Sequence, residues 1–136
     1  MTMRPTELSK GIDKPPHPRL VEHQQVGRIL ARVGDKWSML TIGLLSDGAR
    51  RFNDIKRTLD GISQRMLTLT VRGLERDGLV KRTVYPTNPP RVDYELTELG
   101  RSLWQPVLAL IVWAQMHRTE IEQAHQAFDQ VHKPDR

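Results

Sequence analysis

The chain has 136 residues, of which 38% are hydrophobic and 27% are charged, and its formal net charge is +5. This length predicts one domain, and no apolar run reaches the roughly 18–20 residues that a membrane span needs. The sequence contains no cysteine, which excludes disulfides, thiolate metal ligands and thiol-based sensing by these residues. No apolar block follows a basic start, so we expect a cytoplasmic protein.

The first predicted segment is a flexible arm over residues 1–19, which hold four of the nine prolines and few large apolar side chains. We expect one folded domain over residues 20–126 and a polar tail over residues 127–136. Inside the domain, the first helix shows apolar spacing typical of an amphipathic helix and ends at Gly34. The spaced residues are Val26, Ile29, Leu30 and Val33.

A second helix is expected between Asp35, which can cap its N-terminus, and the turn at Asp47-Gly48. We expect the buried side to carry Trp37, Leu40, Leu44 and Leu45.

A short extended piece at residues 49–52 precedes two further helices. Asn53 or Asp54 could cap the third helix, and Ser63 is the predicted cap of the fourth, which ends at Asp77-Gly78. The residues expected to face inward are Ile55, Leu59, Leu67, Val71 and Leu74.

Two strands follow, at residues 79–85 and 92–96, where polar and apolar side chains alternate. The segment between them, residues 86–91, is too long for a two-residue turn. Its proline pair makes the connection stiff and extended. The two strands therefore predict a hairpin with a rigid loop.

A last helical region begins at Thr97, its predicted N-cap, and we expect Pro106 to kink or split it. Apolar side chains cover more than one side of this region, which exceeds what the core of a small monomer needs. Together with the apolar stripe of the first helix, this excess predicts a homodimer. The expected interface residues are Val26, Ile29, Leu30, Trp104, Leu108, Ile111, Val112 and Trp113.

The positive charge is concentrated in the middle third of the chain. Residues 50–91 hold ten basic and four acidic side chains, a net charge of +6, whereas the other residues hold eleven basic and twelve acidic ones. A contiguous basic segment favours a polyanionic partner. Aromatic residues make up only 5% of the chain, which argues against binding of single strands by base stacking.

The order of predicted elements describes a mainly helical (α+β) fold with a small β-hairpin wing, the winged helix-turn-helix. The helix after Ser63 fits the major groove of duplex DNA, with its first turn facing the base edges. We expect Arg65 to read a base, because arginine bonds guanine in bidentate fashion, and Arg91 on the wing to hold a phosphate. The candidate DNA-binding residues are Arg51, Ser63, Gln64, Arg65, Thr68, Arg72, Asn88 and Arg91.

Three motifs occur together and in order: Gly-Ile-Ser at 61–63, Leu-Glu-Arg-Asp-Gly-Leu-Val at 74–80 and Pro-Pro-Arg-Val at 89–92. On these residues the chain resembles the HxlR family, winged-helix regulators related to the MarR type, over about Val26 to His117. The resemblance implies a homodimer with an interface of first and last helices, and repression or activation of nearby genes. Many members that sense electrophiles or oxidants use a cysteine just before the first helix. Residues 18–23 have none, so any signal would come from a small molecule or another protein.

Other classes of function are weaker. No nucleophile motif, phosphate loop or paired-carboxylate pattern is present, so we expect neither an enzyme nor a bound cofactor. The five histidines form no tight metal-binding pattern. The main alternative is a winged helix that binds only protein. RNA is disfavoured, because the major groove of A-form RNA is too narrow for a helix.

Overall fold

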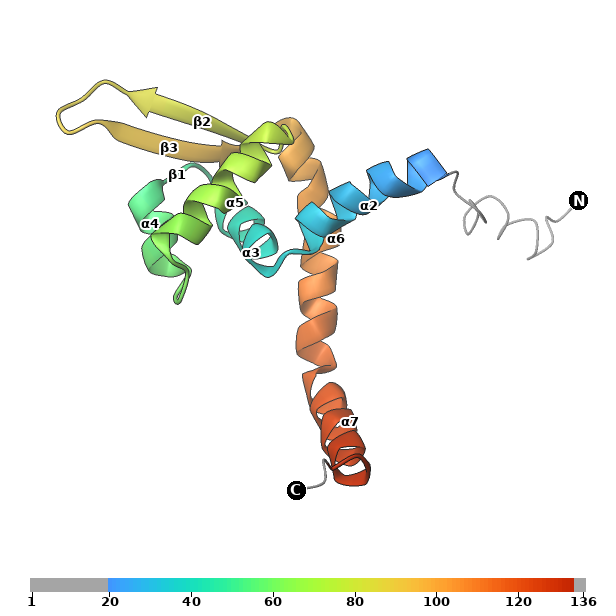
Figure 1. Cartoon of the computed structure of the whole chain (residues 1–136). Coiled ribbons are helices and arrows are strands. Elements are labelled where there is room, and N and C mark those ends of the chain that lie inside the picture. The colour runs from blue at the N-terminus through green and yellow to red at the C-terminus, as the bar shows by residue number, and fades with distance from the viewer. Residues whose placement is uncertain (1–19, 134–136) are drawn as a thin grey trace, which may run out of the picture. The chain divides into compact units, whose positions relative to one another are not determined.

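The computed structural model describes residues 20–133, with side chains from residue 23 onward. The arm predicted for residues 1–19 lies outside the described residues. The chain divides into two compact units, Met1–Lys36 and Trp37–Arg136. Figure 1 labels the elements α2 (Leu20–Gly34), α3 (Lys36–Leu45), β1 (Arg50–Arg51), α4 (Phe52–Thr58), α5 (Gln64–Arg76), β2 (Val80–Tyr85), β3 (Arg91–Leu96), α6 (Glu98–Met116) and α7 (Arg118–Val131).

The described part of the first unit is helix α2, which ends at Gly34 as predicted. Val26, Ile29 and Leu30 are 52%, 62% and 63% exposed. Their spacing of three and four residues places them on one side of the helix. This helix therefore presents an apolar stripe that its own unit does not bury.

Helix α3 turns most of the predicted face to the core, since Leu45 is buried and Trp37 and Leu44 are partly buried against it. Thr41, Ile42 and Leu45 are buried, whereas Leu40 is 38% exposed, so the predicted burial of Leu40 is wrong. The Thr41 hydroxyl donates a hydrogen bond of 2.7 Å to the carbonyl of Trp37. This bond lets a polar residue occupy the core without an unpaired hydroxyl, which the apolar spacing alone could not indicate.

The predicted N-caps of two helices are confirmed. Ser63 Oγ accepts a hydrogen bond of 3.0 Å from the Met66 amide at the start of α5. Thr97 Oγ1 accepts one of 3.1 Å from the Gly100 amide at the start of α6. Each cap satisfies an amide that has no partner inside its helix.

The predicted cap of the third helix is wrong. Helix α4 begins at Phe52, and its N-cap residue Arg51 makes no capping bond through its side chain. Asn53 and Asp54 instead lie in the first turn, where the Asp54 carboxylate pairs with Arg57. The reason is that β1 ends at Arg51, so the chain passes from strand to helix without a linking residue.

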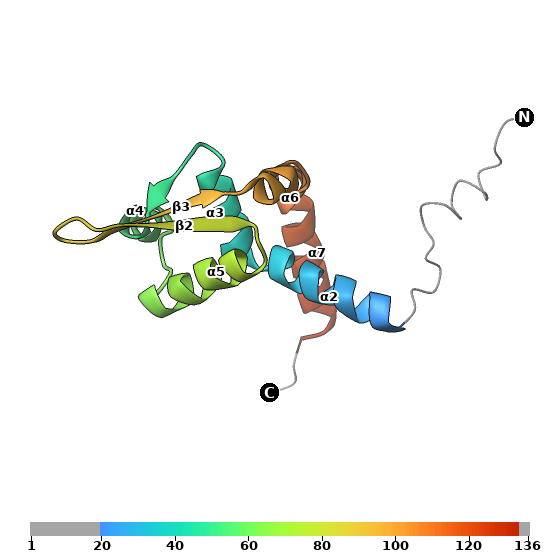
Figure 2. The same ribbon diagram turned by 90° about the horizontal axis from the view of Figure 1, so that it is seen from above.

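The sheet has three antiparallel strands in the order β1-β3-β2. The hairpin register runs from Val80 opposite Leu96 to Tyr85 opposite Arg91. Val84 is 50% exposed, because the outer half of the hairpin extends beyond the core. The hairpin loop, α4 and the N-terminal end of α5 lie at the same end of this unit (Figures 1 and 2).

The core of the second unit gathers apolar side chains from α3, α4, α5 and the sheet, and Leu103 and Trp104 of α6 pack against it. The inward positions predicted for α4 and α5 are confirmed by their burial. Partly buried residues at the edge of this core are Trp37, Leu44, Phe52, Val92, Leu103 and Trp104.

Helix α6 passes through Pro106 without a break and ends at Met116, so of the two expectations for this proline, a kink or a split, the split is wrong and the kink stays a prediction. Pro106 has no amide hydrogen to donate to the carbonyl of Ser102. Ser102 is an exposed residue that water can reach. Helix α7 has no buried residue and continues to Val131. The helix therefore extends past residue 126 into the segment predicted as a polar tail.

Candidate DNA-binding surface

Helix α5 is fixed by its apolar side, and this orients its polar side outward. Leu67, Val71 and Leu74 are at most 1% exposed, and they recur at spacings of three and four residues. The opposite side carries Arg65 and Arg72, both exposed. Because seven residues are nearly two helical turns, these two guanidinium groups lie along one face of the helix.

The first turn of α5 begins with the Ser63 cap, after which Gln64 and Arg65 are exposed. The predicted residues Ser63, Gln64 and Arg65 therefore stand together at the open end of the helix. A helix N-terminus favours negative charge through its free amides and its dipole. This end of α5 is suited to a phosphate or to the edge of a base.

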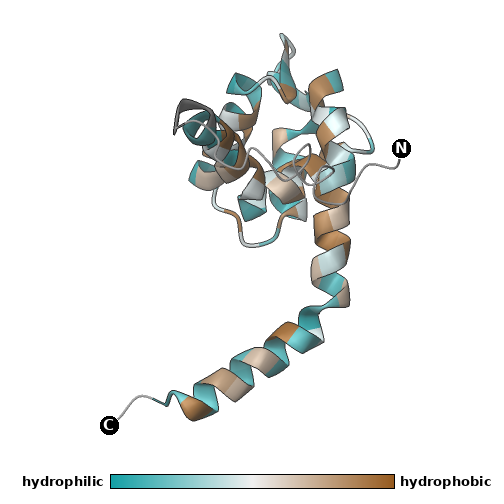
Figure 3. Ribbon diagram, turned by 90° about the vertical axis from the view of Figure 1, so that its right-hand side faces the viewer, coloured by the Kyte–Doolittle hydropathy of each residue, from teal (hydrophilic) through white to brown (hydrophobic). Residues whose placement is uncertain are grey.

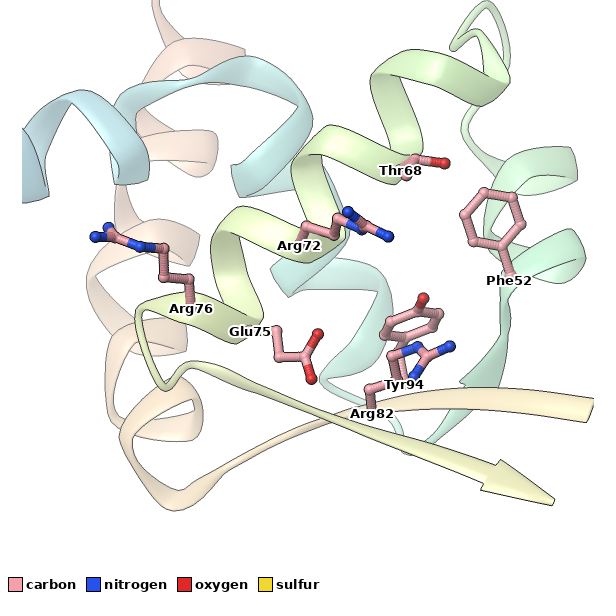
Figure 4. Close-up of a pocket in the computed structure, with 7 residues that line it drawn as sticks. All are labelled: Phe52, Thr68, Arg72, Glu75, Arg76, Arg82 and Tyr94. Atoms are coloured by element: carbon pink, nitrogen blue, oxygen red, sulfur yellow. The ribbon is translucent and has the colours of Figure 1, made fainter.

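A cleft of about 670 Å³ lies between α5 and the sheet. Thr68 and Arg72 point into it toward Phe52, whereas Arg76 points the other way (Figure 4). Arg82 lies directly opposite Tyr94 in the strand register, so both side chains are on the same face of the sheet. The cleft thus brings guanidinium groups from α5 and β2 close to the aromatic rings of Phe52 and Tyr94.

Sequence reasoning missed Arg82 as a member of this surface. The alternation of β2 alone does not say which face a side chain shares with α5. Pairing with β3 supplies that information, because Tyr94 is 6% exposed and belongs to the core. The spacing of two residues from Val80, which is 2% exposed, was a second signal for this face.

A second groove, of about 750 Å³, separates the wing from α4. Three predicted residues line it: Arg51, Asn88 and Arg91. Phe52 and Tyr94 line both hollows. The groove and the cleft are therefore parts of one continuous surface, which collects residues predicted from β1, α5 and the wing.

The wing loop is held by local hydrogen bonds. Thr87 Oγ1 donates a hydrogen bond of 2.7 Å to the Pro89 carbonyl. The Arg91 guanidinium carbon lies 4.4 Å from the centre of the Tyr85 ring, and its Nη2 donates to Asp93 Oδ2 at 3.3 Å. Arg91 is thus already anchored in the wing, a constraint that its sequence position did not predict.

The arginines of this surface differ in their partners. Arg57 pairs with Asp54, and Arg91 pairs with Asp93. In the part of the chain that the structure describes, Arg51, Arg65 and Arg72 have no carboxylate within ion-pairing distance. All three side chains are exposed, and Glu75 lines the same cleft as Arg72 without forming an ion pair with it.

The residues predicted for a dimer interface fall into two groups in the second unit. Trp104, Leu108 and Ile111 are partly buried, and Trp104 packs against its own core. Val112 and Trp113 are 40% and 54% exposed. Apolar segments continue along α6 and α7 toward the C-terminal end (Figure 3). Exposed members that the sequence reasoning left out are Leu110, Met116, Ile121, Phe128 and Val131.

Residues 20–133 contain neither a metal site nor a membrane-spanning helix. Within this range, no group of three or more histidine or carboxylate side chains could hold a metal ion. His117 instead contacts Glu120, at 2.8 Å, and the ring of Trp113. None of the helices in the same range is long and apolar enough to cross a membrane.

Comparison with known proteins assigns the chain to a family. The family model described as HxlR-like helix-turn-helix matches residues 32–122. Over 95 residues the chain is 41% identical to YdeP of Bacillus subtilis (strain 168), an uncharacterized HTH-type transcriptional regulator, covering 70% of this chain and 74% of that protein.

Two solved structures of regulators are similar in both sequence and fold. The redox regulator HypR in its reduced form is 42% identical, with a TM-score of 0.67 over 73% of this chain and 98% of HypR. The reduced form of the transcriptional regulator YodB from B. subtilis is 31% identical, with a TM-score of 0.59 over 82% of this chain and 96% of YodB. These matches confirm the winged-helix architecture.

Proposed function

The chain belongs to the HxlR-like helix-turn-helix family and is a transcriptional regulator, not an enzyme, and we propose that it binds an inverted-repeat DNA operator as a homodimer. Helix α5 enters the major groove and the wing follows the backbone of the same duplex. The protein then controls neighbouring genes by occupying the operator, in the cytoplasm.

The observation that carries this proposal is the set of exposed arginine side chains on α5 and beside the wing that have no ion-pair partner among the described residues. Arg65 and Arg72 project from one face of α5, and Arg51 lies beside the wing. Exposed charges without protein partners stay available for phosphates and base edges. A surface that bound only another protein would not need arginines aligned along a helix that fits the major groove of DNA.

The homodimer rests on apolar faces that the chain does not bury. Trp113 is 54% exposed and Met116 is 71% exposed on α6, and Phe128 on α7 is 60% exposed. Soluble monomers rarely leave apolar patches of more than a few hundred Å² uncovered. A two-fold dimer predicts half-sites about 10 base pairs apart, centre to centre, or a multiple of this spacing.

A direct test compares binding to duplex DNA with binding to duplex RNA of the same sequence. The DNA is first selected from a random pool with the purified protein, and fluorescence anisotropy then gives Kd over a range of salt concentrations. We expect selected inverted repeats, weak binding to RNA, and a steep loss of affinity with salt as condensed counterions are released.

The matched variants are Arg65→Ala combined with Arg72→Ala, and Arg118→Ala with Lys133→Ala as a charge control. Arg118 lies on α7, where its side chain is 78% exposed beside Glu122, and Lys133 is exposed after the end of α7. Only the first pair should abolish operator binding. Equal binding of DNA and RNA, or no duplex binding at all, would contradict the proposal and favour a winged helix that binds protein.

A further inference from the structure

Leu69 is an exposed apolar residue at the centre of the polar face of α5. Its side chain is 52% exposed, whereas Leu67 and Leu74 of the same helix are fully buried. A single exposed leucine is ordinary on a protein surface. The unusual feature here is its position, because Arg65 and Arg72 flank it on the same face and neither has an ion-pair partner among the described residues.

The charge of this face limits what can cover Leu69. A second copy of the chain packed across α5 would bring the arginines of both helices together, and like charges in contact oppose association. Duplex DNA has the complementary charge. In the major groove, the one apolar group on a base edge is the 5-methyl group of thymine.

We propose that Leu69 reads a thymine in each half-site by packing against its 5-methyl group, an inference that rests on the proposed function of α5. The rise of about 1.5 Å per residue places Leu69 about 6 Å beyond Arg65 and about 4.5 Å before Arg72. A base step rises about 3.4 Å. The thymine therefore lies within one or two steps of the bases that the two arginines face.

The test replaces thymine with deoxyuridine, which lacks only the methyl group and keeps the same hydrogen-bonding edge. Each thymine of a duplex selected from random DNA is substituted in turn, and anisotropy gives Kd. For the wild-type protein we expect one thymine per half-site at which deoxyuridine weakens binding about fourfold, the effect of removing one methyl-sized group from an apolar contact. Substitution in both half-sites should weaken binding about sixteenfold.

The Leu69→Ala variant should bind the thymine operator more weakly and lose the deoxyuridine effect at that position. The control is Leu99→Ala, because Leu99 on α6 is 58% exposed and lies outside the DNA-binding surface. This variant should keep the wild-type response. A thermal midpoint equal to that of the wild type shows that each variant is folded.

Three results would overturn the inference. The first is a wild-type protein indifferent to deoxyuridine at every position, the second is a half-site without a required thymine, and the third is an undiminished deoxyuridine effect in Leu69→Ala. All three leave duplex binding intact and so leave the proposed function standing. Failure of the wild type to bind any duplex would instead overturn the proposed function, and this inference with it.

Discussion

Arg91 and Asp93 form an ion pair on β3, in which Nη2 donates to Oδ2 at 3.3 Å and Nε lies 3.3 Å from Oδ1. The Nε contact is not aligned as a hydrogen bond, and both of its atoms are buried. Residues two apart on a strand share a face, so the pair is a direct result of strand formation. The charge that we assigned to a phosphate is therefore partly offset and fixed in direction by the protein.

Because Arg91 and Asp93 are paired, the effect of each charge on DNA binding can be measured separately. Arg91→Ala should weaken binding to operator and random duplexes nearly alike, and reduce the salt slope by about one unit. Asp93→Asn should raise affinity for random DNA, because it removes the carboxylate that opposes the phosphates. Titrations over a salt series measure both effects.

The double variant Arg91→Ala with Asp93→Asn is the control for an unpaired carboxylate, since the Asp93 side chain is only 16% exposed. If it binds as weakly as Arg91→Ala, the loss belongs to the arginine. A change in the preferred bases outside the flanking A·T positions would contradict backbone contact. A weaker preference for an A·T-rich flank would instead place Arg91 in a narrow minor groove.

Arg65 is expected to read a base. It is exposed in the first turn of α5, two residues after the Ser63 cap. Arg65→Ala should cost about 1–3 kcal/mol on the operator and relax selectivity at one position in each half-site. Selection from random DNA with wild type and variant measures this change. Equal weakening on operator and random DNA would reduce Arg65 to a phosphate contact.

Local signals in the sequence predicted much of this fold. Ser63 and Thr97 cap helices through bonds to amides three residues ahead, and such bonds depend only on nearby residues. The buried face of α3 depends on its neighbours in space instead. The prediction left out Ile42, because its neighbour Thr41, which is also buried, interrupts the apolar spacing along the helix.

The same distinction applies to the candidate site. The exposed arginines of α5 followed from helical periodicity, since the buried apolar residues leave only one face open. Arg82 lies two residues after Val80, which is 2% exposed, and directly opposite Tyr94, so strand alternation and register place it on the same face. The pair of Arg91 and Asp93 was not indicated, because Arg91 was predicted in the connecting loop, whereas β3 begins one residue earlier, at Arg91 itself.

The start of α6 depends on close contact with the sheet. A Cβ atom at Gly100 would overlap the carbonyl oxygen of Leu79. The Thr97 hydroxyl also donates a hydrogen bond of 2.6 Å to the Gly78 carbonyl. Gly100→Ala should therefore lower the free energy of unfolding by about 1–3 kcal/mol, the range for overpacking, despite the better helix propensity of alanine.

Thermal or urea unfolding measures this loss. The neighbouring Leu99→Ala is the control, because Leu99 is 58% exposed and its truncation should change stability by less than about 0.5 kcal/mol. A Gly100→Ala protein as stable as the wild type would show that the two segments can separate without cost.

The dimer can be tested on α6. Leu110 and Trp113 are 56% and 54% exposed and lie three residues apart, so they share a face. Glutamate at both positions would bury uncompensated charge in a two-fold interface, which costs several kcal/mol. We expect Leu110→Glu with Trp113→Glu to be a monomer by light scattering at micromolar concentration, where the wild type is a dimer.

Gln115→Glu, on an exposed residue of the same helix, adds charge without removing apolar contact and should remain dimeric. Operator affinity should fall in the monomer far more than affinity for a single half-site, because two linked half-sites no longer bind together. A monomeric wild type, or a double variant that stays dimeric, would exclude this face as the interface.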